Sequence, residues 1–323
     1  MPLVPVSSYP KHALYFSNGH LETLVAPLFA HVGNVPYERE RLELLDGDFI
    51  DLDWLRNGHD RLIILSSGME GNATRHYMKR AADFFSSQGW DVLAWNYRGC
   101  SEEINRLPKT YSYAETHDFR TVINYALKDN CYSTAALLGF SMGGCLVTKY
   151  LGERPGPDHR IKASVSFSVS CNLKDSMQKT ERNPIYNLYF IKKLKQKLQA
   201  KALIHSSIRS IPLNKIKSFD DYLSYYNIPF HHFRDVDDFY VQSSCAQYIS
   251  SIEIPSLMIN PLNDPILGPQ CYPYELAKAN SNFYLETPAT GGHLGYPHSS
   301  PNFNWMAERA NEFINGILKT EKL

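Results

Sequence analysis

The sequence has little of several features that would narrow its function quickly. Its 33 basic and 33 acidic residues cancel, so no excess of positive charge favours a nucleic acid or an acidic surface as a partner. Six cysteines are widely spaced and no C-x-x-C pair occurs, which argues against a zinc site or a redox motif. We therefore expect free thiols, no metal and no nucleic-acid partner.

Long apolar runs are also missing. No stretch approaches the roughly 20 residues that a membrane-spanning helix needs. Met1 to Pro10 contains three prolines and lacks the early basic cluster of a signal peptide. Residues 1–36 have no clear hydrophobic period, so we expect them to be irregular. These features predict a soluble, cytoplasmic protein without an integral membrane segment.

After residue 36, short apolar strands alternate with helical segments. Residues 39–45 and 49–55 alternate polar with apolar side chains around an Asp-Gly-Asp turn, which predicts a hairpin. Apolar runs predict further strands at 62–65, 92–95, 135–139, 161–167, 256–260 and 283–285, and helices at 75–88, 115–129, 143–152, 273–279 and 302–318. Strands that are apolar throughout are typical of a parallel sheet buried on both faces. We predict an α/β fold whose eight-stranded, mostly parallel sheet carries helices on both sides.

Residues 171–250 break this alternation. Residues 174–217 contain 11 lysines or arginines against two acids, and Ile191, Leu194 and Leu198 recur at helical spacing among Lys192, Lys193, Lys195 and Lys197. We interpret 171–250 as a helical cap inserted into a core domain formed by 1–170 and 251–323. The basic helix has two interpretations, a solvated face or a face directed at a membrane or an anionic substrate.

The segment Gly139-Phe140-Ser141-Met142-Gly143 lies between a predicted strand and a predicted helix. A sharp strand-to-helix turn lifts a serine hydroxyl clear of the backbone, and it admits only small residues two positions to either side. Because a serine hydroxyl is a weak nucleophile on its own, it needs a neighbouring base and a group that orients the base. Ser141 is the candidate nucleophile.

The acid should precede the base in the chain for this kind of turn. Asp264 follows the strand at 256–260, at the strand end where open α/β sheets place their sites. An aspartate before proline is also common in ordinary turns. Glu253 and Glu286 are poorer candidates because neither lies in a loop a few residues after a strand.

The candidate base is His293, which follows the last strand in the segment Thr-Gly-Gly-His-Leu-Gly. Glycines on both sides allow a loop to approach another backbone closely. His298 is the alternative. A separate cluster, His231-His232 with Asp235, resembles a metal or acyltransferase site. Two adjacent histidines cannot easily face one ion, so we assign that cluster no role.

A tetrahedral intermediate also needs donors for its negatively charged oxygen. One should be the backbone N–H of Met142, which follows the nucleophile. The second should come from the loop at 66–71, where Gly68 allows an unusual backbone conformation and the N–H of Met69 can point at the site. An ordinary glycine turn is the other interpretation of this loop.

These motifs together resemble the YheT-like and ABHD-type branch of the α/β-hydrolases, and the resemblance runs almost from end to end. The matching segments are Asn18 to Leu24 with the family's N-G-H-L-Q-T, Asp46-Gly47-Asp48 with Leu52-Asp53-Trp54 as its first hairpin, Gly68 to Gly71 with H-G-L-E-G, Asn96 to Ser101 with N-x-R-G-C-S, Gly139 to Gly144 as its elbow, Asn263 to Pro265 with D-D-P, and Gly292 to Gly295 with G-G-H-x-G.

The resemblance implies an α/β-hydrolase in which Ser141 is the nucleophile, Asp264 the acid and His293 the base. The amides of Met69 and Met142 would form the oxyanion hole, and no cofactor is implied. Ser67 stands where the family usually has histidine, and Asn263 replaces the first Asp of D-D-P. ABHD-type members usually carry an N-terminal membrane anchor; residues 1–36 do not resemble one, so we expect a protein closer to the soluble microbial type.

The function implied is hydrolysis of carboxylic esters, from small molecules or lipids, through an acyl-enzyme. Two alternatives remain open. The same residues would serve acyl transfer to an alcohol, and a hydrolase fold with a silent site would serve as a binding protein. Peripheral membrane contact through the basic cap is also compatible with the sequence, which leaves the acyl chain, the alcohol and the oligomeric state undetermined.

Overall fold

The computed structural model describes residues 3–10, 18–29, 33–129, 131–297 and 304–320. One sheet of eight strands has the order β1-β2-β4-β3-β5-β6-β7-β8. The strands are β1 (Glu38–Glu43), β2 (Phe49–Leu55), β3 (Arg61–Ser66), β4 (Asp91–Trp95), β5 (Thr134–Phe140), β6 (Ile161–Phe167), β7 (Ser256–Ile259) and β8 (Phe283–Glu286). β2 pairs antiparallel with β1 and β4, and every other pairing is parallel. The predicted fold class is confirmed.

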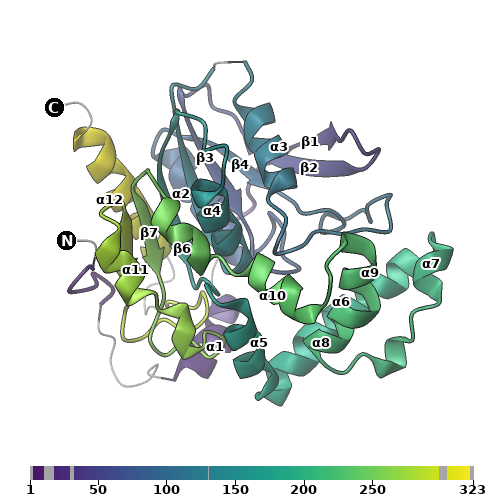
Figure 1. Cartoon of the computed structure of the whole chain (residues 1–323). Helices are drawn as coiled ribbons and strands as arrows, with labels where there is room; N and C mark the ends of the chain where they lie inside the picture. The colour runs from purple at the N-terminus through teal and green to yellow at the C-terminus, as the bar shows by residue number, and fades with distance from the viewer. Residues whose placement is uncertain (1–2, 11–17, 30–32, 130, 298–303, 321–323) are drawn as a thin grey trace.

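Helices cover both faces of the sheet because its central strands are apolar on both sides (Figure 1). Along β3, Leu62 and Ile64 belong to one buried cluster, and Ile63 and Leu65 belong to the other. The first cluster packs against α3 (His117–Ala126), α4 (Met142–Gly152) and α11 (Tyr274–Ala279), and the second against α2 (His76–Ser87) and α12 (Trp305–Thr320).

The expectation that residues 1–36 are irregular is wrong in part, because Gly19–Phe29 forms helix α1. Leu21 and Leu24 are exposed on this helix, whereas Glu22 is buried. In a helix that packs on the core, the apolar side chains are buried and the charged ones are exposed, which is the reverse of what these residues of α1 show. A search for an apolar stripe therefore does not detect this helix. Nearer the N-terminus, Leu3 forms a parallel bridge with Leu285 of the edge strand β8.

The chain between β6 and β7 is helical, as predicted. It contains α5 (Leu173–Glu181), α6 (Pro184–Ala202), α7 (Ser206–Arg209), α8 (Phe219–Tyr222), α9 (Ile228–His231) and α10 (Val236–Ser243), which gather on one side of the molecule (Figure 1). We call residues 173–251 the inserted helical segment. Asn172 and Asn183 start α5 and α6 by accepting backbone N–H bonds at the first turn.

The four lysines at the centre of α6 do not share one face. Lys197 is buried, and Lys201 in the next turn is buried as well. The interpretation of Lys197 as part of a solvated or membrane-directed face is therefore wrong. All six cysteines are unpaired thiols, as expected. No helix within the described parts of the chain is both long and apolar enough to cross a membrane.

Candidate active site

Ser141 lies at the apex of the turn between β5 and α4, with φ 53° and ψ −116°. This backbone conformation is unfavourable for a residue with a side chain. A Cβ atom at Gly143 would lie 2.1 Å from the carbonyl oxygen of Ser66, and a Cβ at Gly139 would lie 2.6 Å from the carbonyl oxygen of Gly143. Both glycines are therefore required by close backbone packing around the serine.

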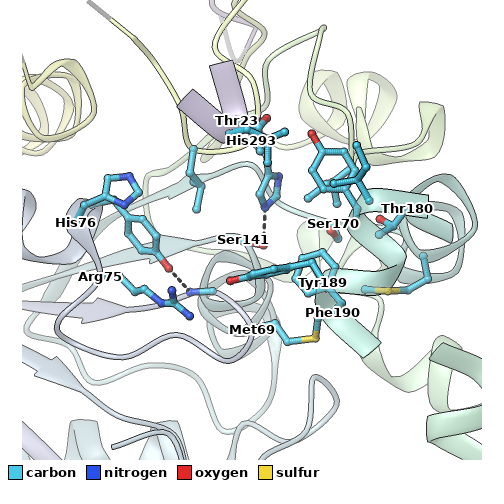
Figure 2. A pocket seen from close by; sticks show the side chains of 18 of the residues that line it. Thr23, Met69, Arg75, His76, Ser141, Ser170, Thr180, Tyr189, Phe190 and His293 are labelled. Carbon is cyan, nitrogen blue, oxygen red and sulfur yellow. Dashed lines mark hydrogen bonds between the residues drawn. The ribbon is translucent and has the colours of Figure 1, made fainter. Parts of the chain in front are cut away.

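Three of the predicted site residues, Ser141, His293 and Asp264, meet although they are far apart in the sequence; Figure 2 shows the first two of them. The hydroxyl of Ser141 donates to Nε2 of His293, with 2.9 Å between the two atoms. The Nδ1–H of His293 donates to Asp264, at 2.9 Å from Oδ2 and 3.2 Å from Oδ1. Asp264 is fully buried and also accepts backbone N–H bonds from Ile266 and Leu267. The arrangement is that of a serine, a base and an orienting carboxylate.

The poorer candidates lie elsewhere. Glu253 pairs with Arg154 on the exposed surface, and Glu286 is buried where it accepts bonds from Arg309 and Ser7. His298 lies outside the described residues. The cluster around His231 is also occupied, because His231 Nδ1 lies 3.2 Å from Glu115 and Asp235 caps α10. Within the described chain, no group of three or more His, Cys, Asp or Glu residues is placed to hold a metal ion.

Helix α1 fastens the loop of His293 to the loop of Asp264. The buried carboxylate of Glu22 accepts from the side-chain amide of Asn263 and from the N–H of Gly291, both at 2.8 Å. Thr23 Oγ1 accepts from the N–H of His293 at 2.8 Å. Burial raises the pKa of Glu22, although these hydrogen bonds oppose the shift. Glu22 and Thr23 are site residues that sequence reasoning missed; the match of Asn18 to Leu24 to a family motif was the available signal.

The loop after β3 approaches Ser141 closely, as predicted. A Cβ atom at Gly68 would lie 3.3 Å from the Cβ of Ser141. Hydroxyl groups fix the backbone of this loop, since Tyr97 donates to the carbonyl of Ser67 and the N–H of Gly68 donates to Tyr77. The carbonyl of Gly68 accepts from the N–H of Gly71 at 2.9 Å.

The backbone of Glu70 is also held by hydrogen bonds. Its backbone is left-handed, with φ 55°. Its N–H donates to the hydroxyl of Tyr111 at 3.0 Å, and its carbonyl accepts from Arg75 at 2.7 Å. The backbone N–H groups of Met69 and Met142 have no protein acceptor among the described residues. Met142 directly follows Ser141 in the chain, and Gly68, which precedes Met69, lies against Ser141.

A cavity of about 410 Å³ opens onto Ser141 and His293 (Figure 2). Its lining is mainly apolar and aromatic, and the inserted helical segment contributes Met177, Thr180, Ile185, Tyr186, Tyr189 and Phe190. Arg75 carries the one permanent charge among the described lining residues. Burial lowers the pKa of His76 to about 4, so this lining histidine is neutral at pH 7. An uncharged, apolar substrate group fits such a cavity.

A model of the family described as "Serine aminopeptidase, S33" matches residues 57–280, more than half of the chain. The chain belongs to this family. Among curated relatives of this family member, "Putative esterase YheT" of Escherichia coli is 29% identical over 95% of this chain and 93% of its own length. "Phospholipase ABHD3" of Bos taurus is 28% identical over 91% of this chain and 74% of its own length. The resemblance noted from the motifs is confirmed.

Solved structures agree with the fold of the family. The Pyrococcus furiosus esterase Pf2001 superposes with a TM-score of 0.60 at 17% identity, covering 95% of this chain and all of that chain. Est1E from Butyrivibrio proteoclasticus, with ferulic acid bound, superposes with a TM-score of 0.56 at 14% identity over 88% of this chain and 100% of that chain. At these identities the likeness establishes the α/β-hydrolase fold alone.

Proposed function

We propose that the protein hydrolyses carboxylic esters in two steps, through an acyl-enzyme on Ser141. Ser141 attacks the ester carbonyl as His293 takes its proton, and Asp264 holds the imidazole and stabilises its charged form. The alcohol leaves after receiving that proton from His293. Water then attacks the acyl-enzyme with His293 again as the base, which releases the acid and regenerates the serine.

The unbroken hydrogen-bond relay from Ser141 through His293 to buried Asp264 is the observation that carries this proposal. Proton transfer requires heavy atoms within hydrogen-bonding reach, and both distances of 2.9 Å meet that requirement. The names of the relatives, an esterase and a phospholipase, support a carboxylic ester hydrolase in general. The individual roles of the three residues are our inference from the geometry.

The amides of Met69 and Met142 are our candidates for the oxyanion hole. Met69 lies between Gly68 and Glu70, whose N–H groups donate to Tyr77 and Tyr111, and Met142 directly follows Ser141. Neither the Met69 nor the Met142 N–H has an acceptor within the described chain. Preorganised donors of this kind contribute most when charge develops on the carbonyl oxygen. We also propose that the inserted helical segment acts as a cap, because it supplies six of the residues that line the cavity.

The family description names an aminopeptidase, but the cavity does not favour that activity. An aminopeptidase must bind the positively charged amino group of a peptide, which calls for a carboxylate near the nucleophile. The charged residue in the described lining is Arg75, a cation. An ester or lipid with an apolar acyl chain fits the lining better than a peptide N-terminus. Acyl transfer to an alcohol would use the same three side chains and differs only in the acceptor.

The test is hydrolysis of p-nitrophenyl esters of increasing chain length, together with labelling by a fluorophosphonate probe. We expect wild type to be active and labelled, and Ser141→Ala to lose both properties. Ser170→Ala is the matched control, because Ser170 lines the same cavity without a bond to His293. Added alcohol that yields a new ester would indicate acyl transfer. A wild-type protein that is inert on every ester and unlabelled would contradict the proposal.

A further inference from the structure

Five large apolar side chains are exposed on two helices that line the cavity; three of them line it directly, and Leu21 and Leu188 lie three residues from Leu24 and Ile185 on the same helices. They belong to two helices that are distant in the sequence, and we call them the apolar collar: Leu21 and Leu24 of α1 with Ile185, Leu188 and Tyr189 of α6. Their exposed fractions lie between 46 and 69%. Single exposed apolar residues are ordinary on a protein surface, but a group beside one cavity indicates an interaction site.

The collar is continuous with the cavity. Leu24, Ile185 and Tyr189 are exposed and also line the cavity that reaches Ser141. The two helices contact each other directly, because Nδ1 of His20 lies 3.1 Å from the hydroxyl of Tyr186 and the two rings stack. An apolar path therefore leads from the molecular surface down to the serine without a charged side chain from either helix.

The accessible charges of α6 are positive. Lys192 is exposed and Lys193 and Lys195 are half-buried, whereas Lys197 and Lys201 are buried, and the helix contains no carboxylate. Glu22, the one carboxylate in α1, is buried, where it accepts from the side-chain amide of Asn263 and the N–H of Gly291. Lys192 is exposed and follows Leu188 and Tyr189 by four and three residues, which places it on the same face of the helix. Arg182 is exposed just before the helix begins.

We propose that the apolar collar docks on a lipid surface and that esters enter the cavity from it. Apolar side chains with adjacent cations match the acyl region and the anionic headgroups at the edge of a bilayer or micelle. This inference rests on the proposed function in one respect: an ester that enters past the collar reaches Ser141, where it would be hydrolysed. Docking itself does not require catalysis, so the two claims can be tested separately.

The experiment measures co-sedimentation of the full chain with vesicles of phosphatidylcholine containing a minority of phosphatidylglycerol. Ser141→Ala serves as the parent so that the vesicles stay intact. The double variant Leu21→Ser/Leu188→Ser removes two collar side chains that do not line the cavity. We expect at least a tenfold loss of partitioning, from the apolar area removed. Lys192→Gln should weaken binding to the anionic vesicles and leave binding to pure phosphatidylcholine unchanged.

Leu203→Ser/Ile204→Ser is the matched control. Both residues are exposed apolar side chains just beyond the far end of α6, and neither lines the cavity. This control should bind vesicles as the parent does. In the active protein, Leu21→Ser/Leu188→Ser should keep its rate on a short soluble ester and lose rate on an ester embedded in vesicles.

Three results would overturn the proposal: a parent protein that stays in the supernatant, equal losses in the collar and control variants, or a collar that mediates only concentration-dependent self-association in ultracentrifugation. If vesicles bind through the collar and no ester is hydrolysed, the docking surface stands and the proposed function fails.

Discussion

Lys197 of α6 forms an ion pair with Glu70 in the loop beside Ser141, with 2.7 Å between Nζ and Oε1. Both side chains are largely buried, and the hydroxyl of Tyr111 donates to the same carboxylate at 2.6 Å. Burial would lower the pKa of Lys197, but Cys100 and Glu70 raise it above its usual value, so the ammonium stays charged. The inserted helical segment thus holds a left-handed residue that adjoins Met69.

We expect Lys197→Met to lower kcat about tenfold to a hundredfold, because a displaced oxyanion donor weakens transition-state binding more than substrate binding. The change leaves the Glu70 carboxylate buried without its cation. KM for a short p-nitrophenyl ester should change little, while the inhibition constant of a boronic acid transition-state analogue should rise in proportion to the loss of kcat. These two measurements separate positioning from a general loss of folded protein.

Lys195→Met is the control for removing a lysine from the same helix and should leave kcat unchanged. Adding Glu70→Gln to Lys197→Met should cost little more than the single change, because the two side chains act as one pair. If Lys197→Met lowers the melting temperature but leaves kcat and analogue binding intact, the pair is purely structural.

Ser141 has a positive φ that costs stability for any residue with a Cβ atom. We expect Ser141→Gly to be more stable than Ser141→Ala by about 1 kcal/mol, since relief of backbone strain exceeds the larger entropy of glycine in the unfolded chain. Both variants lose the hydroxyl and its bond to His293, so the comparison isolates the backbone. Urea unfolding of the two inactive variants measures the difference. Equal stabilities would mean that the turn is not strained.

Much of the fold was predictable because the central strands are short and largely apolar, while the first two strands alternate polar and apolar residues around a turn. The Ser141, Asp264 and His293 positions were predictable for a local reason. Ser141 directly follows β5, and Asp264 and His293 lie in the loops after β7 and β8, and parallel strands bring these ends to one edge of the sheet. Chain order then selects among the remaining acids and histidines. The geometry agrees with the three residues selected in this way, and their catalytic roles remain a prediction.

The contacts made across long sequence distances were not predictable. Lys197 looked like one of several solvated lysines, because its partner Glu70 is far away in the chain. Glu22 lies in a helix whose apolar residues are exposed, so its burial contradicts the local pattern. In both cases a buried charge is compensated by a group from another element. Periodicity reports which face of one helix is apolar, and it cannot report such a partner.

The pair formed by Glu115 and His231 should make stability depend on pH. Burial would raise the pKa of Glu115, but the bonds from His231 and Lys109 outweigh it and lower the pKa to about 2. A carboxyl group whose pKa is lower in the folded protein than in the unfolded chain stabilises the folded state when the pH is above the unfolded-chain pKa, which is near 4.5 for Glu115. That stability is lost as the pH falls from about 4.5 to about 2.

Glu115→Gln should therefore lower the free energy of unfolding by up to about 3 kcal/mol at pH 6. The difference from wild type should shrink steadily below pH 4.5 and vanish near pH 2. Urea unfolding across this range measures it. A constant difference at every pH would show that the side chain acts through packing rather than through its charge.

Glu22 and Asn263 form a pair whose polarity is reversed relative to the family pattern. The family motifs read Gln and Asp at these two positions, where this chain has Glu and Asn. Here the amide of Asn263 donates to Glu22 at 2.8 Å; in the family pattern the amide would lie on the other partner. Asn263→Asp would place two carboxylates in contact in a site where burial already raises the pKa of Glu22.

We expect Asn263→Asp to lose stability and kcat at pH 7, because one carboxylate must stay charged beside another or take up a proton. In the folded variant, the two neighbouring carboxyl groups at 22 and 263 would share a raised pKa. The loss of stability should therefore grow as the pH rises from 5 to 8, because the folded state must give up a proton that it holds more tightly than the unfolded chain does. Adding Glu22→Gln should restore both stability and kcat, since an amide again faces a carboxylate. Asn280→Asp is the control: its amide donates to the carbonyls of Ile249 and Ile252, so Glu22→Gln should not rescue it. Failure of Glu22→Gln to rescue Asn263→Asp would mean that this contact does not hold the Asp264 and His293 loops together.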